Sequence, residues 1–269
     1  MDNRAIGVFD SGLGGLTAVK ELRKILPNET ILYFGDTGRV PYGTRSAEII
    51  AKYTKQDMEF LLKQNVKAIV AACGTVSSNA IHVLKELPVP YTSVIEPSSY
   101  AAIHKSRNGK IGVIATSATI NSGAFEKKLK EINPDVDVFS TACPLLVSLV
   151  ENGFIDENET ITNLALEKYL TPFISKDIDT LILGCTHYPI LKNSIAKIMG
   201  PKVALVSSGE EIAKSCMNIL AENDLLSNNK MNEDEFFVSD SVQDFNDIAK
   251  ICLGQEITEK ITKIDIEKS

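Results

Sequence analysis

The sequence lacks the features of membrane and secreted proteins. No apolar run approaches the ~20 residues that a membrane-spanning helix needs. The first six residues show neither the charged segment nor the apolar block of a signal peptide. The five cysteines are an odd number without CxxC spacing, which in a reducing compartment indicates free thiols. We therefore expect a cytoplasmic protein with no membrane partner.

Positive charge and histidine are also scarce. The chain has 28 Lys and Arg against 35 Asp and Glu, a net charge of −7, and its basic residues are scattered. No nucleic-acid partner is therefore expected. Only three histidines occur, and no zinc-ligand spacing is visible, so no metal is expected. An acidic substrate must be bound locally, by backbone N–H groups and helix N-termini.

Complete nucleotide-binding motifs are missing as well. A glycine-rich turn at 10–15 resembles a dinucleotide fingerprint, but the pattern needs glycine at 17, which is Thr17. No phosphate-binding GxxxxGK[ST] occurs either. The glycines can still let backbone amides approach an anion. We expect no cofactor, although the residues alone leave open a lysine that holds pyridoxal phosphate.

What the chain does contain is a regular alternation of short apolar runs and helical segments, over 269 residues that are 44% hydrophobic. This alternation predicts an α/β protein with mostly parallel sheets. We expect strands at 6–10, 31–34, 66–72, 91–95, 111–115, 136–139, 180–183, 203–206, 236–238 and 261–266. The longer helices are expected at 46–64, 77–87, 117–132, 144–151, 158–174, 189–199, 210–220 and 242–253.

Two of the cysteines have similar sequence surroundings. Cys73 and Cys185 each follow a short run rich in Ile, Val or Leu, at the end of an expected strand. Ligands and chemistry gather at the carboxyl ends of parallel strands, so the pair indicates a site with one thiol on each side of a substrate. A free cysteine is often only a small buried hydrophobe. That interpretation suits Cys216 and Cys252, and Cys143 is a weaker competitor.

The surroundings of the two cysteines also recur. The segment 6–12 is similar to 111–117, at nearly the offset that separates the cysteines. Two similar α/β halves that face each other would explain both. The alternative is that any α/β protein contains several Ile-Gly-Val strands.

Several polar residues are candidates for the same site. Asp10 ends the first strand and is expected beside a thiol, although a turn or cap role is open. His187, two residues after Cys185, is either a metal ligand or, more in keeping with the sequence, a neighbour that tunes or relays protons. Tyr42 and Gly43 lie in a loop that could bind a ligand or be an ordinary turn.

Four motifs in order resemble those of glutamate racemases, within the cofactor-independent aspartate/glutamate racemase family. They are DSGLGG at 10–15, GDTGRVPYG at 35–43, ACGT at 72–75 and GCTHYP at 184–189. The likeness runs from about residue 5 to 222. It implies two α/β domains with mostly parallel sheets across a central cleft, one made of 1–96 plus 208–269 and the other of 97–207. It also implies a homodimer.

The resemblance implies interconversion of L- and D-glutamate without a cofactor, supplying D-glutamate for peptidoglycan synthesis. It implies Cys73 and Cys185 as the two acid/base groups, supported by Asp10 and His187 respectively, with Glu151 in a further supporting role. The implied substrate contacts are Asp10, Ser11, Tyr42, Gly43, Gly74, Thr75, Thr186 and His187. Thiols suit this task because neighbours can lower their unperturbed pKa of ~8.5.

One residue departs from the family pattern. The family usually has Asn where this chain has Gly74, so the side-chain amide that Asn offers the substrate is absent. A water, Ser77 or Asn79 could fill the gap. Three alternatives to glutamate racemisation remain at this point: an aspartate racemase, a thiol hydrolase with Cys73 as nucleophile and His187 as base, and a non-catalytic amino-acid-binding protein. The hydrolase would leave Cys185 without a purpose.

Overall fold

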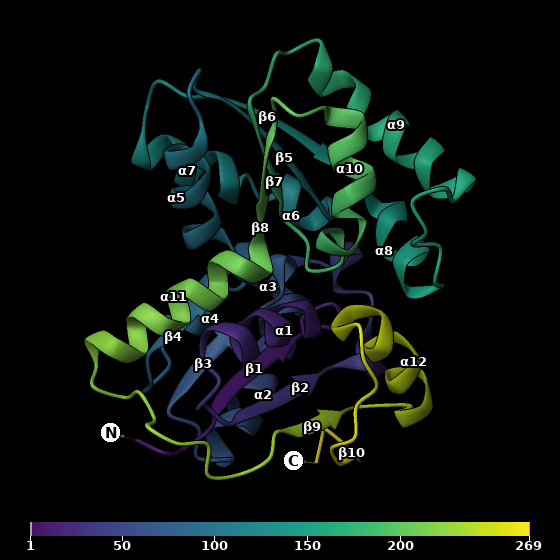
Figure 1. Cartoon of the computed structure of the whole chain (residues 1–269). Helices are drawn as coiled ribbons and strands as arrows, with labels where there is room; N and C mark the ends of the chain where they lie inside the picture. The colour runs from purple at the N-terminus through teal and green to yellow at the C-terminus, as the bar shows by residue number, and fades with distance from the viewer. Residues whose placement is uncertain (1, 269) are drawn as a thin grey trace.

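The computed structural model describes residues 2–268, which form two parallel β-sheets with helices packed around them (Figure 1). The first sheet has six strands in the order β10-β9-β2-β1-β3-β4, and the second has four in the order β6-β5-β7-β8. Every strand pair is parallel, and the expected α/β class is confirmed. No helix within 2–268 is long and apolar enough to cross a membrane.

All ten expected strands occur, with shifted ends. Their bounds are β1 Ile6–Asp10, β2 Ile31–Gly35, β3 Ala68–Ala71, β4 Tyr91–Ser93, β5 Lys110–Ala115, β6 Asp137–Ala142, β7 Thr180–Leu183, β8 Ala204–Ser207, β9 Glu235–Val238 and β10 Ile261–Lys263. The central strands are buried along their whole length, as continuous apolar runs in a covered parallel sheet require.

The helices are mostly where the apolar spacing predicts them. They are α1 Leu16–Ile25, α2 Ala47–Lys63, α3 Gly74–Asn79, α4 Ile81–Leu84, α5 Ile95–Lys105, α6 Ser117–Asn121, α7 Ala124–Ile132, α8 Pro144–Glu151, α9 Thr160–Ile174, α10 Lys192–Met199, α11 Ser208–Glu222 and α12 Val242–Leu253. Three short 3-10 turns complete the list: η1 Thr37–Arg39, η2 Tyr42–Thr44 and η3 Tyr188–Leu191.

Four sequence-based expectations about helices were wrong. The expected helix 77–87 starts three residues earlier and is broken at Ala80 into α3 and α4. The expected helix 117–132 is divided at Gly123, whose φ of +67° is left-handed and ends α6. Helix α5 was not predicted; it holds Pro97 in its first turn, where proline is tolerated. The start of the expected helix 189–199 is the 3-10 turn η3.

The two sheets repeat one strand order. Strands β1 to β4 lie in the order 2-1-3-4, and β5 to β8 lie in the same order within the second sheet. The strand that precedes Cys73 thus pairs with β1, as the strand that precedes Cys185 pairs with β5. This repetition agrees with the expectation of two similar halves. Strands β9 and β10 extend only the first sheet.

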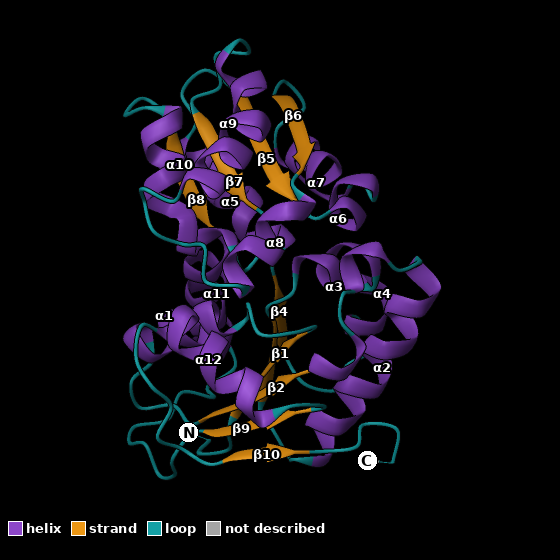
Figure 2. Cartoon of the chain, turned by 90° about the vertical axis from the view of Figure 1, so that its right-hand side faces the viewer, coloured by secondary structure: helices purple, strands orange, loops and turns teal. Residues whose placement is uncertain are grey.

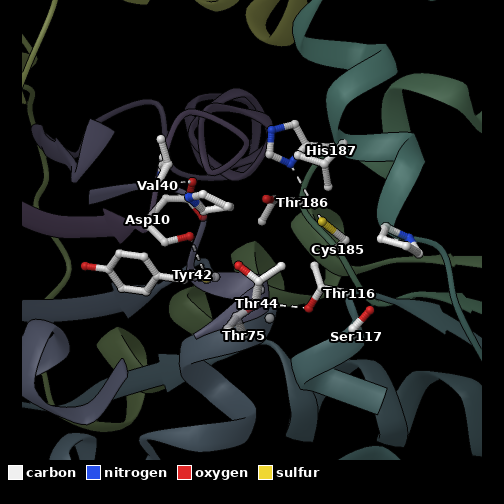
Figure 3. Close-up of a pocket in the computed structure, with 18 of the residues that line it drawn as sticks. Asp10, Val40, Tyr42, Thr44, Thr75, Thr116, Ser117, Cys185, Thr186 and His187 are labelled. Atoms are coloured by element: carbon white, nitrogen blue, oxygen red, sulfur yellow. Dashed lines mark hydrogen bonds between the residues drawn. The ribbon is translucent and has the colours of Figure 1, made fainter. Parts of the chain in front are cut away.

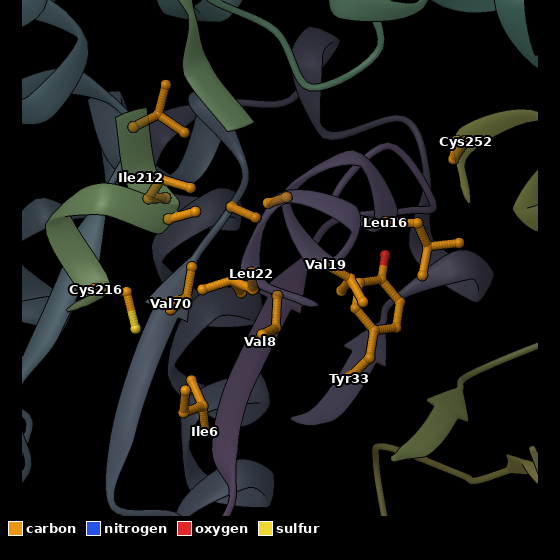
Figure 4. Close-up of a cluster of buried hydrophobic side chains, with 14 of the residues drawn as sticks. Ile6, Val8, Leu16, Val19, Leu22, Tyr33, Val70, Ile212, Cys216 and Cys252 are labelled. Atoms are coloured by element: carbon orange, nitrogen blue, oxygen red, sulfur yellow. The ribbon is translucent and has the colours of Figure 1, made fainter. Parts of the chain in front are cut away.

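The core joins the two sheets into one body. Side chains of α1 spaced by three or four residues, such as Leu16, Val19 and Leu22, pack on Val8 and Val70 (Figure 4). The same buried cluster reaches the second sheet through residues of α5 and α11. Cys216 and Cys252 lie in this cluster, as expected for small buried hydrophobes.

The chain passes between the two halves twice. It leaves the first sheet after β4 through α5, and returns from β8 into α11 (Figure 2). Helix α11 packs against both α1 and α5. The carboxyl ends of the central strands of the two sheets therefore face one another across the region between these crossings.

Candidate active site

A cavity of about 360 Å³ lies between the two halves, at the carboxyl ends of β1, β3, β5 and β7 (Figure 3). The lining comes from both halves: residues 10–12, 40–44 and 73–75 from the first, and 116–117, 144, 147–148, 151 and 184–187 from the second. Every site residue expected from the sequence lines this cavity: Asp10, Ser11, Tyr42, Gly43, Cys73, Gly74, Thr75, Glu151, Cys185, Thr186 and His187.

Cys73 follows β3 and immediately precedes α3. Its sulfur lies 3.1 Å from the hydroxyl oxygen of Ser11 and is almost fully buried. Burial raises the pKa of this thiol to about 12, and the nearby Asp10 carboxylate adds to the rise. The Ser11 hydroxyl and the backbone N–H groups of Val76 and Ser11 oppose it without cancelling it. Cys73 is therefore a neutral thiol at neutral pH.

Cys185 has a different neighbour on the opposite side of the cavity. Its sulfur is 3.7 Å from His187 Nδ1, and His187 Nε2 is 3.0 Å from Glu151 Oε1. Burial lowers the pKa of His187, but the interactions with Cys185 and Glu151 outweigh burial and raise that pKa to about 10. The imidazole is therefore cationic at neutral pH, and a cation at this distance stabilises negative charge on the sulfur of Cys185.

Asp10 lies beneath the glycine-rich turn that leads into α1. Its Oδ2 accepts the backbone N–H of Gly12 at 2.9 Å. Burial raises the pKa of this carboxyl, while the His187 charge and the N–H groups of Gly12 and Gly15 counteract that rise. The turn itself packs closely on the second half, because a Cβ at Gly14 would lie 2.3 Å from Thr186 Oγ1. Asp10 is thus buried beside Cys73, as expected from the sequence.

Tyr42 lines the cavity, but its hydroxyl does not face it. The hydroxyl donates to Asp36 and contacts Asp57 Oδ2 at 3.1 Å, and the ring extends away from Cys185 (Figure 3). Arg39 joins the same two carboxylates at 2.6 and 2.5 Å. Only the backbone of the loop 40–44 and its smaller side chains are therefore available to a ligand.

Hydroxyl groups connect the two halves around the cavity. Thr75 Oγ1 lies 3.0 Å from Thr116 Oγ1, which in turn lies 3.0 Å from Thr119 Oγ1. On the other side, Thr17 Oγ1 donates to the carbonyl of Thr186 at 2.9 Å. These bonds hold the cavity closed on both flanks. Thr116 and Ser117 were not singled out from the sequence, although they follow β5 as Cys185 follows β7, and this repetition was the available signal.

Ser77 and Asn79, which were considered as substitutes for the missing Asn side chain, form hydrogen bonds with other groups. Ser77 Oγ bonds the carbonyl of Cys73 at 2.8 Å and the N–H of Val94 at 3.0 Å. Asn79 Nδ2 donates to the carbonyl of Thr75 at 3.0 Å. Neither residue lines the cavity. Cys143 is also outside it, with its sulfur 3.6 Å from the carbonyl of Thr141.

The charges of the cavity are unusual for a site that would take an acidic ligand. Its lining contains neither lysine nor arginine, and its ionisable groups are Asp10, Glu151, His187, the two cysteines and Tyr42, whose hydroxyl points away. The lining of the cavity therefore offers no lysine that could hold pyridoxal phosphate. Within 2–268, no three His, Cys, Asp or Glu side chains are grouped as metal ligands would be. Binding must rest on backbone N–H groups, hydroxyls and the single cationic imidazole.

Comparison with known proteins identifies the family. The sequence model of the Asp/Glu/Hydantoin racemase family matches residues 16–216. The chain belongs to this family. It is 43% identical to the glutamate racemase of Chlorobaculum tepidum over 255 residues, covering 94% of this chain and 93% of the relative. It is 44% identical to the glutamate racemase of Bacillus cereus over 268 residues, covering 99% and 98%.

A solved member of the family has the same fold. The glutamate racemase of Francisella tularensis, crystallised with D-glutamate, superposes with a TM-score of 0.93 at 42% identity, covering 100% of both chains. The resemblance to glutamate racemases that the four motifs indicated is confirmed.

Proposed function

We propose that this racemase-family protein interconverts L- and D-glutamate by a two-base proton transfer at the α-carbon. The observation that carries the proposal is the placement of Cys73 and Cys185 in one cavity, on opposite halves. Racemisation removes the α-proton from one face and returns a proton to the other. A single base would tend to restore the original configuration, whereas two opposed thiol groups let one remove the α-proton while the other gives its own proton to the opposite face.

The surroundings of the two thiols support different roles for them. Cys73 is neutral and can donate a proton. Cys185 lies 3.7 Å from the cationic imidazole of His187, and we propose it as the group that accepts one. The resting protein is then set for L-glutamate, with Cys185 taking the α-proton and Cys73 giving its own to the opposite face. The product state has the proton on Cys185, which is the form that D-glutamate requires. Glu151 keeps His187 charged through this exchange.

The α-proton of an amino acid is only weakly acidic, so the site must stabilise the carbanion that develops. A substrate that fills the cavity would displace water from it, which strengthens electrostatic interactions inside. The hydroxyls of Ser11, Thr75, Thr116 and Thr186, together with backbone N–H groups of the loops, supply donors for the substrate. Ser11, Tyr42, Gly43, Gly74, Thr75 and Thr186 are the proposed contacts, with Tyr42 acting through its backbone. The product would serve peptidoglycan synthesis.

The test is racemisation by Cys73→Ser and Cys185→Ser variants in deuterated water, followed by proton NMR and chiral analysis. Loss of a positioned acid or base costs about 10²–10⁴-fold in rate, so each variant should lose racemisation to that extent. Cys216→Ala, outside the cavity, is the control for removing a thiol. Near-normal racemisation by either serine variant would end the two-base proposal.

The same experiment separates the alternatives. Aspartate in place of glutamate would identify an aspartate racemase, and exchange of neither α-proton would favour a binding protein. A hydrolase would form an acyl-enzyme at Cys73 and would not depend on Cys185. We prefer glutamate because the relatives above 40% identity carry that name.

We also propose a domain division and an oligomeric state. Residues 1–96 plus 208–269 would form one domain and 97–207 the other, in keeping with the membership of the two sheets. Movement about the two chain crossings would open the cavity for substrate. We further propose that the protein is cytoplasmic and forms a homodimer, as the resemblance to glutamate racemases implies. Sedimentation analysis of the purified protein tests the dimer.

A further inference from the structure

Gly74 and Gly184 bring the two halves into backbone contact between the two cysteines. Gly74 follows Cys73 and begins α3, and Gly184 precedes Cys185 at the end of β7. A Cβ at position 74 would lie 2.3 Å from the carbonyl oxygen of Gly184, a distance that real Cβ atoms essentially never show. Position 74 can therefore hold only glycine in this arrangement.

Gly184, which faces Gly74, is held in place by the second sheet. Gly184 is tied to the second sheet, because its N–H donates to the carbonyl of Ile114 at 2.8 Å. A Cβ at Gly184 itself would lie 2.8 Å from a Phe125 ring carbon and 3.0 Å from the Ile114 carbonyl, so this strand end is closely packed. Gly14 also lies close to the second half, but it differs from Gly74 in what it faces. The atoms near Gly14 belong to the side chains of Thr186 and His187, not to the backbone.

We propose that Gly74 is a positioning residue that sets the separation of Cys73 and Cys185. The contact joins the peptide units adjacent to both cysteines, so any atom inserted there moves one thiol relative to the other. The consequence for rate rests on the proposed function, whereas the separation itself does not. Because glycine stands at position 74, where the family usually has Asn, the backbones of the two halves can come into contact here.

A Cβ at position 74 should act on catalysis rather than on folding. Alanine normally stabilises a helix relative to glycine, and Gly74 lies in α3. The added methyl would instead push α3 away from β7 and stretch the Thr75–Thr116 hydrogen bond beside it. A misplacement of about 1 Å in a reacting geometry can cost 10²-fold in rate.

The test compares Gly74→Ala and Gly74→Asn with the wild-type protein. Gly109→Asn is the matched control, because a Cβ there meets nothing within 4 Å and Asn tolerates its φ of +73°. The thiols are bridged with dibromobimane, a short reagent that joins two nearby thiols, and the linked peptides are identified by mass spectrometry. Turnover numbers are measured for both enantiomers, and melting temperatures report folding.

We expect wild type and Gly109→Asn to bridge Cys73 to Cys185 and to differ less than twofold in kcat. Gly74→Ala should lose at least tenfold in kcat in both directions, Gly74→Asn more, and the yield of the bridge should fall in the same order. Unchanged bridging and kcat in folded Gly74→Ala would overturn the proposal. So would failure of the wild-type cysteines to be bridged, a result that needs no variant to fold. Bridging by a wild-type protein that does not racemise would instead overturn the proposed function alone.

Discussion

At the scale of single residues, the two thiols differ in what controls their protonation. The pKa of Cys73 is raised first by burial and then by the charge of Asp10. Replacing Asp10 by Asn removes the charge and keeps an oxygen to accept the Gly12 N–H. We expect Asp10→Asn to lower the pKa of Cys73 and therefore to speed its alkylation by iodoacetamide at pH 8 several-fold. Peptide mass spectrometry over time measures this, and a rate equal to that of wild type would show that Asp10 carries no charge there.

His187 provides a second prediction at this scale. Its pKa is raised to about 10 by Cys185 and Glu151 against the effect of burial. The chain has three histidines, so the His187 ring signal can be followed by NMR. In wild type it should stay protonated through neutral pH and lose its proton near pH 10. In Glu151→Gln it should lose its proton at lower pH, because one of the two stabilising partners is then uncharged. Titration of wild-type His187 near the ordinary value of 6.5 would contradict the assigned charge state.

The sequence predicts which residues lie together at the site, but it does not predict the direction of their pKa shifts. Cys73, Cys185 and Asp10 could be predicted because each lies at the carboxyl end of an apolar strand, and ligands bind at those ends in a parallel sheet. The direction of the Cys73 pKa shift could not, since burial depends on packing from distant segments. The direction of the Tyr42 hydroxyl could not be predicted either, since it is set by the carboxylates of Asp36 and Asp57.

At the scale of elements, the loop between β2 and α2 owes its shape to one arginine. Arg39 is paired with the buried carboxylates of Asp36 and Asp57, and Ser239 donates to Asp36 at 2.7 Å. Arg39→Leu would leave two buried acids without a cation, which typically costs about 3–5 kcal/mol. Urea denaturation should show a loss of that size. Lys130→Ala, which breaks an exposed pair with Glu126, should cost only about 0.3–0.5 kcal/mol.

The pH dependence of this loss has a definite sign. Burial and the Asp36 charge already raise the pKa of Asp57, and Arg39 opposes them. Without Arg39 the folded-state pKa rises further above the unfolded value, so the folded variant binds protons more tightly than the unfolded one. The deficit of Arg39→Leu should therefore be smallest at acid pH and grow as pH rises. A deficit independent of pH would contradict this account.

The boundaries of some helices could not be predicted from the local sequence pattern. Strands in covered sheets could be predicted from apolar runs alone. The division of 117–132 into α6 and α7 depends on the left-handed Gly123, which a helical pattern does not reveal. Helix α5 begins with Ile95-Glu-Pro and packs against α7 and α11, and a local sequence pattern does not show such contacts with distant segments.

At the scale of the whole molecule, the two chain crossings contain buried hydroxyls with no hydrogen-bond partner among the described residues. They belong to Ser98 and Ser99 of α5 and Ser208 of α11, helices that pack together. A buried hydroxyl without a partner costs about 1–3 kcal/mol. This cost falls on the two crossings about which we propose that the halves move.

Removing one of these hydroxyls should therefore stabilise the protein. We expect Ser98→Ala to raise the unfolding free energy by up to about 1 kcal/mol, or roughly 2–4 °C in melting temperature for a chain of this size. Ser77 is the matched control, because it is equally buried but accepts the Val94 N–H. Ser77→Ala should lower stability by about 1–3 kcal/mol, since it leaves that donor unpaired. Equal losses in both variants would mean that the Ser98 hydroxyl has a partner in the closed form, and the strain at the crossings would then have to lie elsewhere.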